Sequence, residues 1–131
     1  MLSGMDMSEE EFDRLLLEAI DEGFSTVGES SKQAIYFHLE NGFKIPRQEI
    51  PRKMDEFEHA IERIFGLGAD FLEILIMKLL YEKVNRKVQL QNPRDFKFTV
   101  YVKAARRSFL QQKEEVKKRI TEELVSSSRQ G

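Results

Sequence analysis

Cysteine is absent from this 131-residue sequence, and proline occurs only three times. Without cysteine the chain has no disulfide, no thiolate nucleophile and no cysteine-ligated zinc, which favours a cytoplasmic protein. Long apolar runs are missing as well. The longest, residues 71–80, is interrupted by Glu73 and Lys78 and is far shorter than the roughly 20 residues that span a membrane. The first residues are acidic, so we expect no secretory signal. Without a spanning segment we also expect no membrane partner.

The length and composition suit one folded domain. The chain is 40% hydrophobic and 34% charged, which excludes wholesale disorder and a collagen-like fibre. A chain of this size supports one core and leaves no room for a separate cofactor module. We therefore expect a single domain over residues 1–131, with frayed ends at residues 1–7 and 126–131 and with no cofactor.

Charge is strongly segregated along the chain, although the net charge is only −2. Residues 1–31 contain nine acidic residues and one basic residue, whereas residues 86–119 contain eleven basic and three acidic residues. A basic block of this size suits either nucleic acid or the acidic block of the same chain or of a second subunit. Pairing within the protein is favoured, because the acidic block is already tethered and repels phosphate.

Two helices are predicted in the first 42 residues. A Ser-x-x-Glu capping pattern at residues 8–11 opens the first helix, and Gly23 ends it. The second helix opens at Thr26 or alternatively at Ser30, and the Asn-Gly pair at residues 41–42 supplies its left-handed stop.

Two prolines restrict the next segment, residues 43–51, to an ordered loop. Ile45 and Ile50 are expected to bury this loop against the helices. A third helix follows over residues 53–65, and Gly66 caps it.

The fourth predicted helix starts near Gly68 and is apolar on nearly all sides, so we place it at the centre of the core. Glu73 lies inside it. A buried, unpaired carboxyl at this position would have a raised pKa, as functional carboxylates often do. A salt bridge or a surface position is the favoured interpretation of this residue.

The segment after Tyr81 fits two structures. Apolar and polar residues alternate over residues 96–103, a strand pattern, and residues 88–91 offer a hairpin partner. Asn92 and Pro93 instead suit the start of a helix. The helical stripe is the longer pattern, and its members are Phe98, Val102, Ala105, Phe109, Val116, Ile120 and Leu124. We therefore predict an all-α fold of about five helices that ends in a long amphipathic helix.

The length of this last helix predicts a homodimer. A helix over residues 93–124 is roughly 48 Å long, whereas a compact domain of this size is roughly 36 Å across. The helix must overhang or kink. An overhanging apolar stripe is covered most simply by a second copy of the chain across a two-fold axis.

The two histidines offer only a weak metal site. His59 and Glu62 lie three residues apart on one predicted helix face, and His38 lies on another helix. A metal-dependent hydrolase is thus a third hypothesis, but an ordinary surface pair is favoured because no tight His-Glu-x-x-His cluster is present.

The basic face of the last helix is the candidate interaction surface. Its members are Lys103, Arg106, Arg107, Lys113, Lys117, Lys118 and Arg119. Glu114 and Glu115 interrupt it, and their spacing predicts i, i+4 ion pairs with Lys118 and Arg119. A solvated helix face is favoured over a nucleic-acid recognition helix.

The middle of the chain resembles a known family. The residues that carry the resemblance are Val27-Gly28-Glu29-Ser30-Ser31-Lys32-Gln33-Ala34-Ile35-Tyr36, His38-Leu39-Glu40, Glu49-Ile50-Pro51, Phe57, Ile61, Ile64-Phe65-Gly66-Leu67-Gly68-Ala69 and Leu72-Glu73. Residues 27–80 are similar to the archaeal Nitrosopumilus output domain family, fifth class. The resemblance implies an all-helical output or interaction module of archaeal signalling systems, without assigned catalytic residues.

These observations favour a non-enzymatic archaeal regulatory or protein-interaction module. We expect it to form a homodimer and to bind a further protein. The alternative is a nucleic-acid-binding transcriptional regulator that uses the basic last helix.

Overall fold

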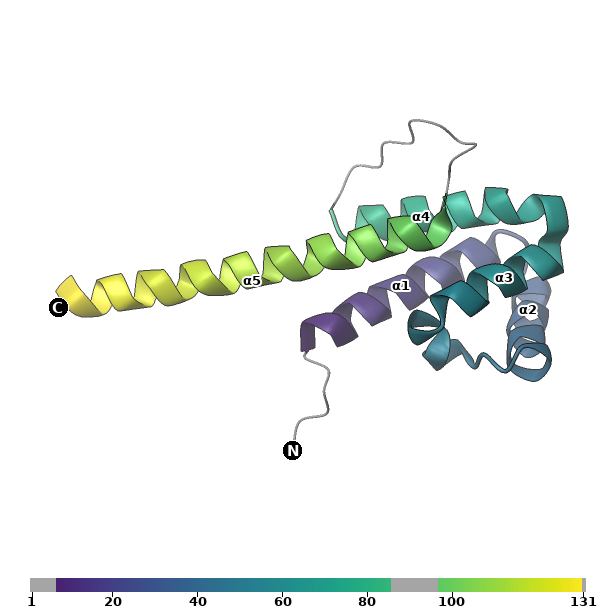
Figure 1. The fold of residues 1–131 in the computed structure, drawn as a ribbon, viewed down its shortest axis with the longest axis horizontal. Coiled ribbons are helices and arrows are strands. Elements are labelled where there is room, and N and C mark those ends of the chain that lie inside the picture. The colour runs from purple at the N-terminus through teal and green to yellow at the C-terminus, as the bar shows by residue number, and fades with distance from the viewer. Residues whose placement is uncertain (1–6, 86–96, 131) are drawn as a thin grey trace.

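The described residues of the chain fold into helices (Figure 1). The computed structural model describes residues 7–85 and 97–130. In chain order its elements are α1 (Met7–Ser25), α2 (Glu29–Gly42), the 3-10 helix η1 (Arg47–Arg52), α3 (Met54–Phe65), the 3-10 turn η2 (Gly66–Gly68), α4 (Ala69–Lys83) and α5 (Phe98–Gln130). No strand occurs within the described residues, so the prediction of an all-α fold is confirmed.

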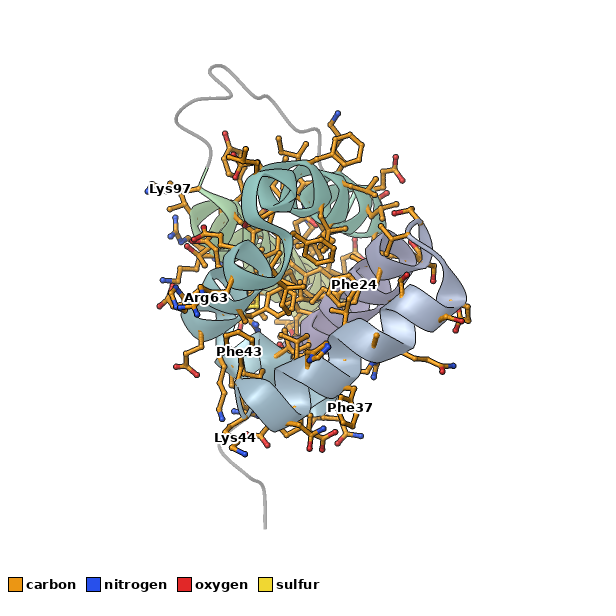
Figure 2. The ribbon with its side chains drawn as sticks, turned by 90° about the vertical axis from the view of Figure 1, so that its right-hand side faces the viewer. Phe24, Phe37, Phe43, Lys44, Arg63 and Lys97 are labelled. Carbon is orange, nitrogen blue, oxygen red and sulfur yellow. The ribbon has the colours of Figure 1, made fainter. Side chains whose placement is uncertain are left out.

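The core lies where α4 meets α1, the most extensive contact between two helices of the structure. The helix α4 also packs against α3 and α5, so the prediction that it is central is confirmed. Figure 2 shows Phe24 of α1 in the interior, where its ring lies 6.3 Å from that of Phe57. One side of α4 is nevertheless open, because Phe71 is exposed.

The helix α1 does not end at Gly23 but continues to Ser25. Gly23 is buried against Ile76 of α4, and a Cβ built on it would lie only 2.6 Å from Cγ1 of Ile76. The glycine therefore allows two helices to approach closely and does not act as a stop. At the other end, α1 begins at Met7, so Ser8 lies inside the helix and not at the predicted cap.

The turns on either side of α2 differ from the prediction. Gly28, with φ of 104°, precedes α2, so neither Thr26 nor Ser30 caps it. The hydroxyl of Thr26 instead donates to the carbonyl of Gly23 at 2.6 Å, which satisfies the end of α1. The helix continues through Gly42, and the left-handed residue is Lys44, with φ of 62°.

The loop that follows is ordered as predicted. Ile45 and Ile50 are fully buried, and residues 47–52 form the 3-10 helix η1. Gly66, with φ of 58°, follows α3 in the left-handed region, so its predicted role as a cap is confirmed.

The helix α5 runs along α4 and α1 and then projects beyond the other helices (Figure 1). The choice of helix over strand is confirmed for residues 98–103; the predicted start at Pro93 lies outside the described residues. The helix continues to Gln130. That residues 126–131 are frayed stays a prediction. The predicted overhang is present.

Candidate functional site

The first three turns of α5 are built into the core. Phe98, Val102, Ala105 and Phe109 are buried. The ring of Phe98 lies 6.2 Å from that of Phe57 in α3, and the ring of Phe109 lies 5.8 Å from that of Phe12 in α1. This half of α5 is therefore held in place by the bundle.

The same face is uncovered further along the helix. Val116, Ile120 and Leu124, hereafter the α5 stripe, are 54%, 53% and 67% exposed. Ile120 lies eleven residues, about three helical turns, after the buried Phe109, so both lie on the same side of the helix. The face that packs in the core thus continues into solvent as an unpartnered apolar surface.

Two of the seven predicted basic residues are neutralised by α1. Nη2 of Arg106 lies 2.8 Å from Oδ1 of Asp13, and the guanidinium lies 4.5 Å from the centre of the Phe12 ring. Nζ of Lys113 lies 3.5 Å from Oε1 of Glu11 and 5.3 Å from the centre of the Phe109 ring. For Arg106 and Lys113 the prediction that the basic block pairs with the acidic block of the same chain is confirmed.

The other five basic residues face solvent; they are Lys103, Arg107, Lys117, Lys118 and Arg119. The ion pairs predicted from Glu114 to Lys118 and from Glu115 to Arg119 are not formed in the described part of α5. At exposed positions such pairs gain little free energy. The structure therefore leaves five cations available on the projecting helix.

Glu73 is a buried acidic residue in the middle of α4. Only 2% of it is exposed, and no ion pair joins it to the described residues, so the favoured salt bridge or surface position was wrong. Burial, together with the like charges of Glu58, Glu62 and Asp70, raises the pKa of Glu73 to about 8. Glu58 itself accepts a hydrogen bond from the backbone N–H of Thr99 at 3.2 Å, at the start of α5.

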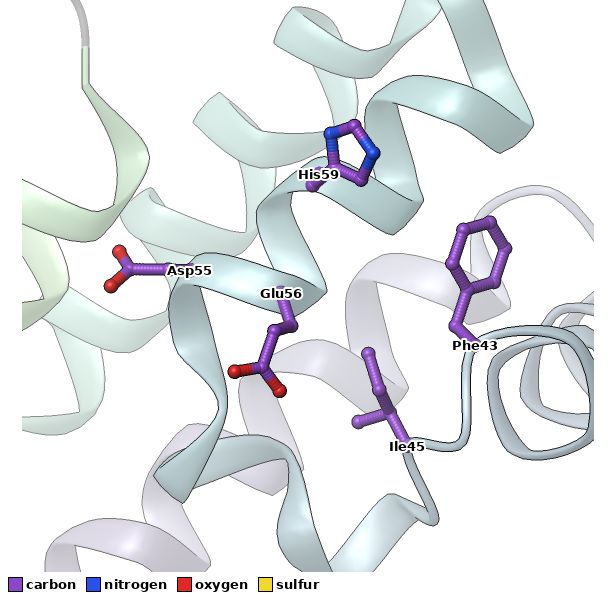
Figure 3. A pocket seen from close by; sticks show the side chains of 5 residues that line it. All are labelled: Phe43, Ile45, Asp55, Glu56 and His59. Carbon is purple, nitrogen blue, oxygen red and sulfur yellow. The ribbon is translucent and has the colours of Figure 1, made fainter.

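The two histidines are exposed and lie apart from any carboxylate cluster suited to a metal. His59 lines a shallow pocket of about 330 Å³ together with Phe43, Ile45, Asp55 and Glu56 (Figure 3). The carboxylate of Asp55 points away from the other side chains in this view. Across the described ranges no group of three or more His, Cys, Asp and Glu side chains is placed to share a metal ion, so the hydrolase hypothesis has no metal site there.

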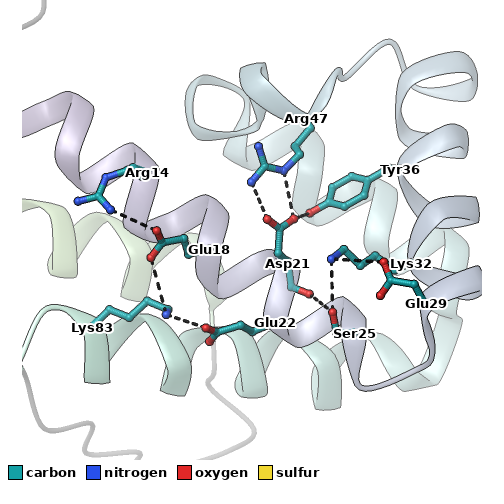
Figure 4. A network of polar contacts seen from close by, with 10 residues as sticks. All are labelled: Arg14, Glu18, Asp21, Glu22, Ser25, Glu29, Lys32, Tyr36, Arg47 and Lys83. Carbon is teal, nitrogen blue, oxygen red and sulfur yellow. Dashed lines mark hydrogen bonds and ion pairs between the residues drawn. The ribbon is translucent and has the colours of Figure 1, made fainter.

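A polar network that the sequence did not reveal joins α1, α2 and η1 (Figure 4). Arg47 donates from Nε and Nη2 to the two oxygens of Asp21, at 3.1 and 2.6 Å, and the hydroxyl of Tyr36 donates to Oδ1 of Asp21. Burial alone would raise the pKa of Asp21, but the hydrogen bonds from Arg47 and Tyr36 lower it below its ordinary value. Burial and the nearby Asp21 carboxylate raise the pKa of Tyr36. Tyr36 and Arg47 lie 15 and 26 positions after Asp21 in the sequence, so no local spacing pointed to this network.

Comparison with known proteins adds no relative. No protein-family model matches the sequence, and neither a curated protein nor a solved structure matches it significantly. The resemblance of residues 27–80 to the archaeal family stays a prediction. Among the described helices, none is both long enough and apolar enough to cross a membrane.

Proposed function

We propose that this chain is a non-enzymatic regulatory module that binds protein through the α5 stripe. The observation that carries the proposal is the exposure of Val116, Ile120 and Leu124 on the face that is buried at Phe109. Exposed apolar surface with helical spacing and charged neighbours is typical of a docking face for another helix.

The free energy gained by burying the α5 stripe supports a partner for the projecting segment. Full burial of one Val, Ile or Leu side chain contributes about 1.5–3 kcal/mol. Leu110 packs against the core and Lys113 pairs with Glu11, so residues 114–130 extend beyond the packed part of α5. Most of the stability of a helix in a protein comes from tertiary packing of its apolar face, and this segment has no such packing within the described chain. A bound protein would both cover the stripe and keep the segment helical.

The wider biological setting follows from the resemblance of residues 27–80. An archaeal, cytoplasmic signalling module whose output is a protein contact is consistent with a rigid bundle that presents one projecting helix. The bundle would then supply a fixed base for the stripe, because the first half of α5 is anchored by Phe98 and Phe109.

Photo-crosslinking in cells of the source organism tests this function. A photoreactive phenylalanine is placed at Leu124 and, as a matched control, at Lys118, which lies on the opposite side of α5 from the stripe. The proposal expects protein adducts at position 124 and few at position 118. Absence of protein adducts at position 124 contradicts it.

A nucleic-acid-binding regulator is the second candidate, favoured by the five exposed cations of α5. Binding of duplex DNA through these residues would fall steeply as salt rises from about 50 to 200 mM. Fluorescence anisotropy with labelled duplex measures this, with Lys117→Gln and Arg107→Gln as weakened variants. No binding at about 50 mM salt would eliminate this candidate.

A further inference from the structure

We propose that the partner of the α5 stripe is a second copy of this chain, whose α5 runs antiparallel and crosses the first at Ile120. This inference rests on the proposed function, because it names the occupant of the same surface. The order of apolar and charged residues along the exposed half of α5 carries it.

The apolar residues are symmetric about Ile120. Val116 precedes it by four residues and Leu124 follows it by four, and all three are at least half exposed. In an antiparallel pair that crosses at Ile120, each Val116 therefore lies beside the partner's Leu124, and the two Ile120 side chains meet at the two-fold axis. One continuous apolar contact results, with no side chain of the stripe left uncovered.

The charges change sign across Ile120, which also suits an antiparallel pair. Residues 117–119 are basic, and Glu122 and Glu123 are acidic. Arg119 and Glu123, four residues apart, flank the stripe on one side. Antiparallel pairing places Arg119 of one copy near Glu123 of the other, twice. Parallel pairing in register places Arg119 and Glu123 of one copy on the opposite edge of the contact from those of the other copy, so it lacks these two ion pairs.

These charges are available for a partner. Arg119, Glu122 and Glu123 form no ion pair within the described part of the chain. By contrast, Lys113 is paired with Glu11 of α1, so the free surface of α5 begins after residue 113. Ile120 is eleven residues, about 16 Å, beyond Phe109, so the packed halves of the two copies lie on opposite sides of the contact.

Cysteine cross-linking tests the orientation, since the natural chain contains no cysteine. Single variants Val116→Cys and Leu124→Cys are purified and oxidised separately and as a mixture. The proposal expects a disulfide-linked dimer in the mixture and little in either variant alone, since identical positions lie about 12 Å apart along an antiparallel pair. Efficient linkage of each variant to itself indicates a parallel pair and overturns the proposal. Lys118→Cys is the control on the opposite side.

A charge exchange provides a second readout that does not depend on a disulfide. Arg119→Glu and Glu123→Arg are each expected to raise the dimer dissociation constant about fivefold, because each creates like-charged neighbours. The double variant R119E/E123R restores opposite neighbours and is expected to recover the original value. Sedimentation equilibrium measures all four proteins, with circular dichroism to verify that each variant folds.

A monomer for the unmodified chain at tens of micromolar overturns the self-association. The proposed function is judged separately by the photo-crosslinking experiment: adducts at Leu124 with other proteins, and none with a second copy, would sustain a docking role while refuting a second copy. Loss of all adducts would refute both.

Discussion

Gly23 of α1 lies so close to Ile76 of α4 that a Cβ on the glycine would meet Cγ1 of the isoleucine at 2.6 Å. Real Cβ atoms do not approach other atoms so closely. The contact lies in the most extensive helix–helix interface of the protein, and the branched side chain of Ile76 is stiff. The glycine therefore sets the distance between α1 and α4.

Gly23→Ala is expected to destabilise the protein by about 1–3 kcal/mol, because overpacking outweighs the better helix propensity of alanine. Gly42→Ala is the matched control. Gly42 also lies in a helix, but a Cβ there meets nothing within 4 Å. The control is expected to be neutral or slightly stabilising. Urea unfolding compares the two, and equal stability of both variants would refute the role of the contact.

Glu73 predicts a dependence of stability on pH. Its pKa is about 8 in the folded protein, above the ordinary 4.5 that it regains on unfolding. The folded state therefore binds the proton more tightly, and stability is lost as the pH rises from about 4.5 to about 8. Glu73→Gln is expected to stabilise the protein by about 1–3 kcal/mol at pH 8 and hardly at pH 4.5.

The measurement for Glu73 is chemical unfolding at both pH values. The exposed Glu40→Gln serves as the control and is expected to change stability little at either pH. A Glu73→Gln variant whose gain is the same at the two pH values would show that the carboxyl is not protonated in the fold.

Asp21 is expected to make the stability of the fold depend on pH in the opposite direction. Its pKa is lowered in the folded state, so its contribution is present above the ordinary value of 3.8 and is lost as the pH falls. Asp21→Asn is expected to cost about 1–3 kcal/mol at pH 7, because Arg47 loses a charged partner with which it makes two hydrogen bonds. Thermal unfolding at pH 7, with the exposed Asp55→Asn as control, measures the loss. A difference below experimental error would argue against the network.

Arg106 and Arg107 are neighbours in sequence with different surroundings. Arg106 pairs with Asp13 and stacks on Phe12, whereas Arg107 is exposed. Arg106→Gln is expected to destabilise the protein by about 1–2 kcal/mol, and Arg107→Gln by less than about 0.5 kcal/mol. Calorimetric unfolding of the two variants tests the asymmetry, and a larger loss from Arg107→Gln would reverse the assignment.

Much of the fold follows from periodicity and local stop signals. The long stripe from Phe98 to Leu124 distinguished helix from strand, because a pattern of seven turns outweighs four alternating pairs. Ile45 and Ile50 were expected to bury the loop, and they do. These features depend on nearby residues only, which is why the sequence reveals them.

The incorrect predictions concern local signals whose outcome depends on the packing of the whole fold. Gly23 has the local appearance of a helix stop, but its role depends on Ile76, 53 positions away. The left-handed turn falls on Lys44 and not on the Asn-Gly pair before it, because α2 continues to Gly42 and the chain turns afterwards into the buried Ile45.

The candidate site was partly predictable. The apolar stripe was expected from its helical periodicity, and the overhang of α5 was expected from the length of the helix. Which basic residues are paired and which are exposed could not be predicted. Arg106 and Lys113 pair with α1 only because the fold brings Asp13 and Glu11 beside them. The burial of Glu73 likewise depends on how α3 and α5 cover α4, which no pattern within α4 specifies.

Hydrogen–deuterium exchange along α5, followed as protein concentration rises, tests most directly whether the stripe is covered by protein. Amides of residues 98–109 are expected to be protected at every concentration, because the bundle buries that half. Amides of residues 113–124 are expected to exchange fast at low concentration and at least tenfold slower at tens of micromolar. Fast exchange of residues 113–124 at all concentrations would contradict the account.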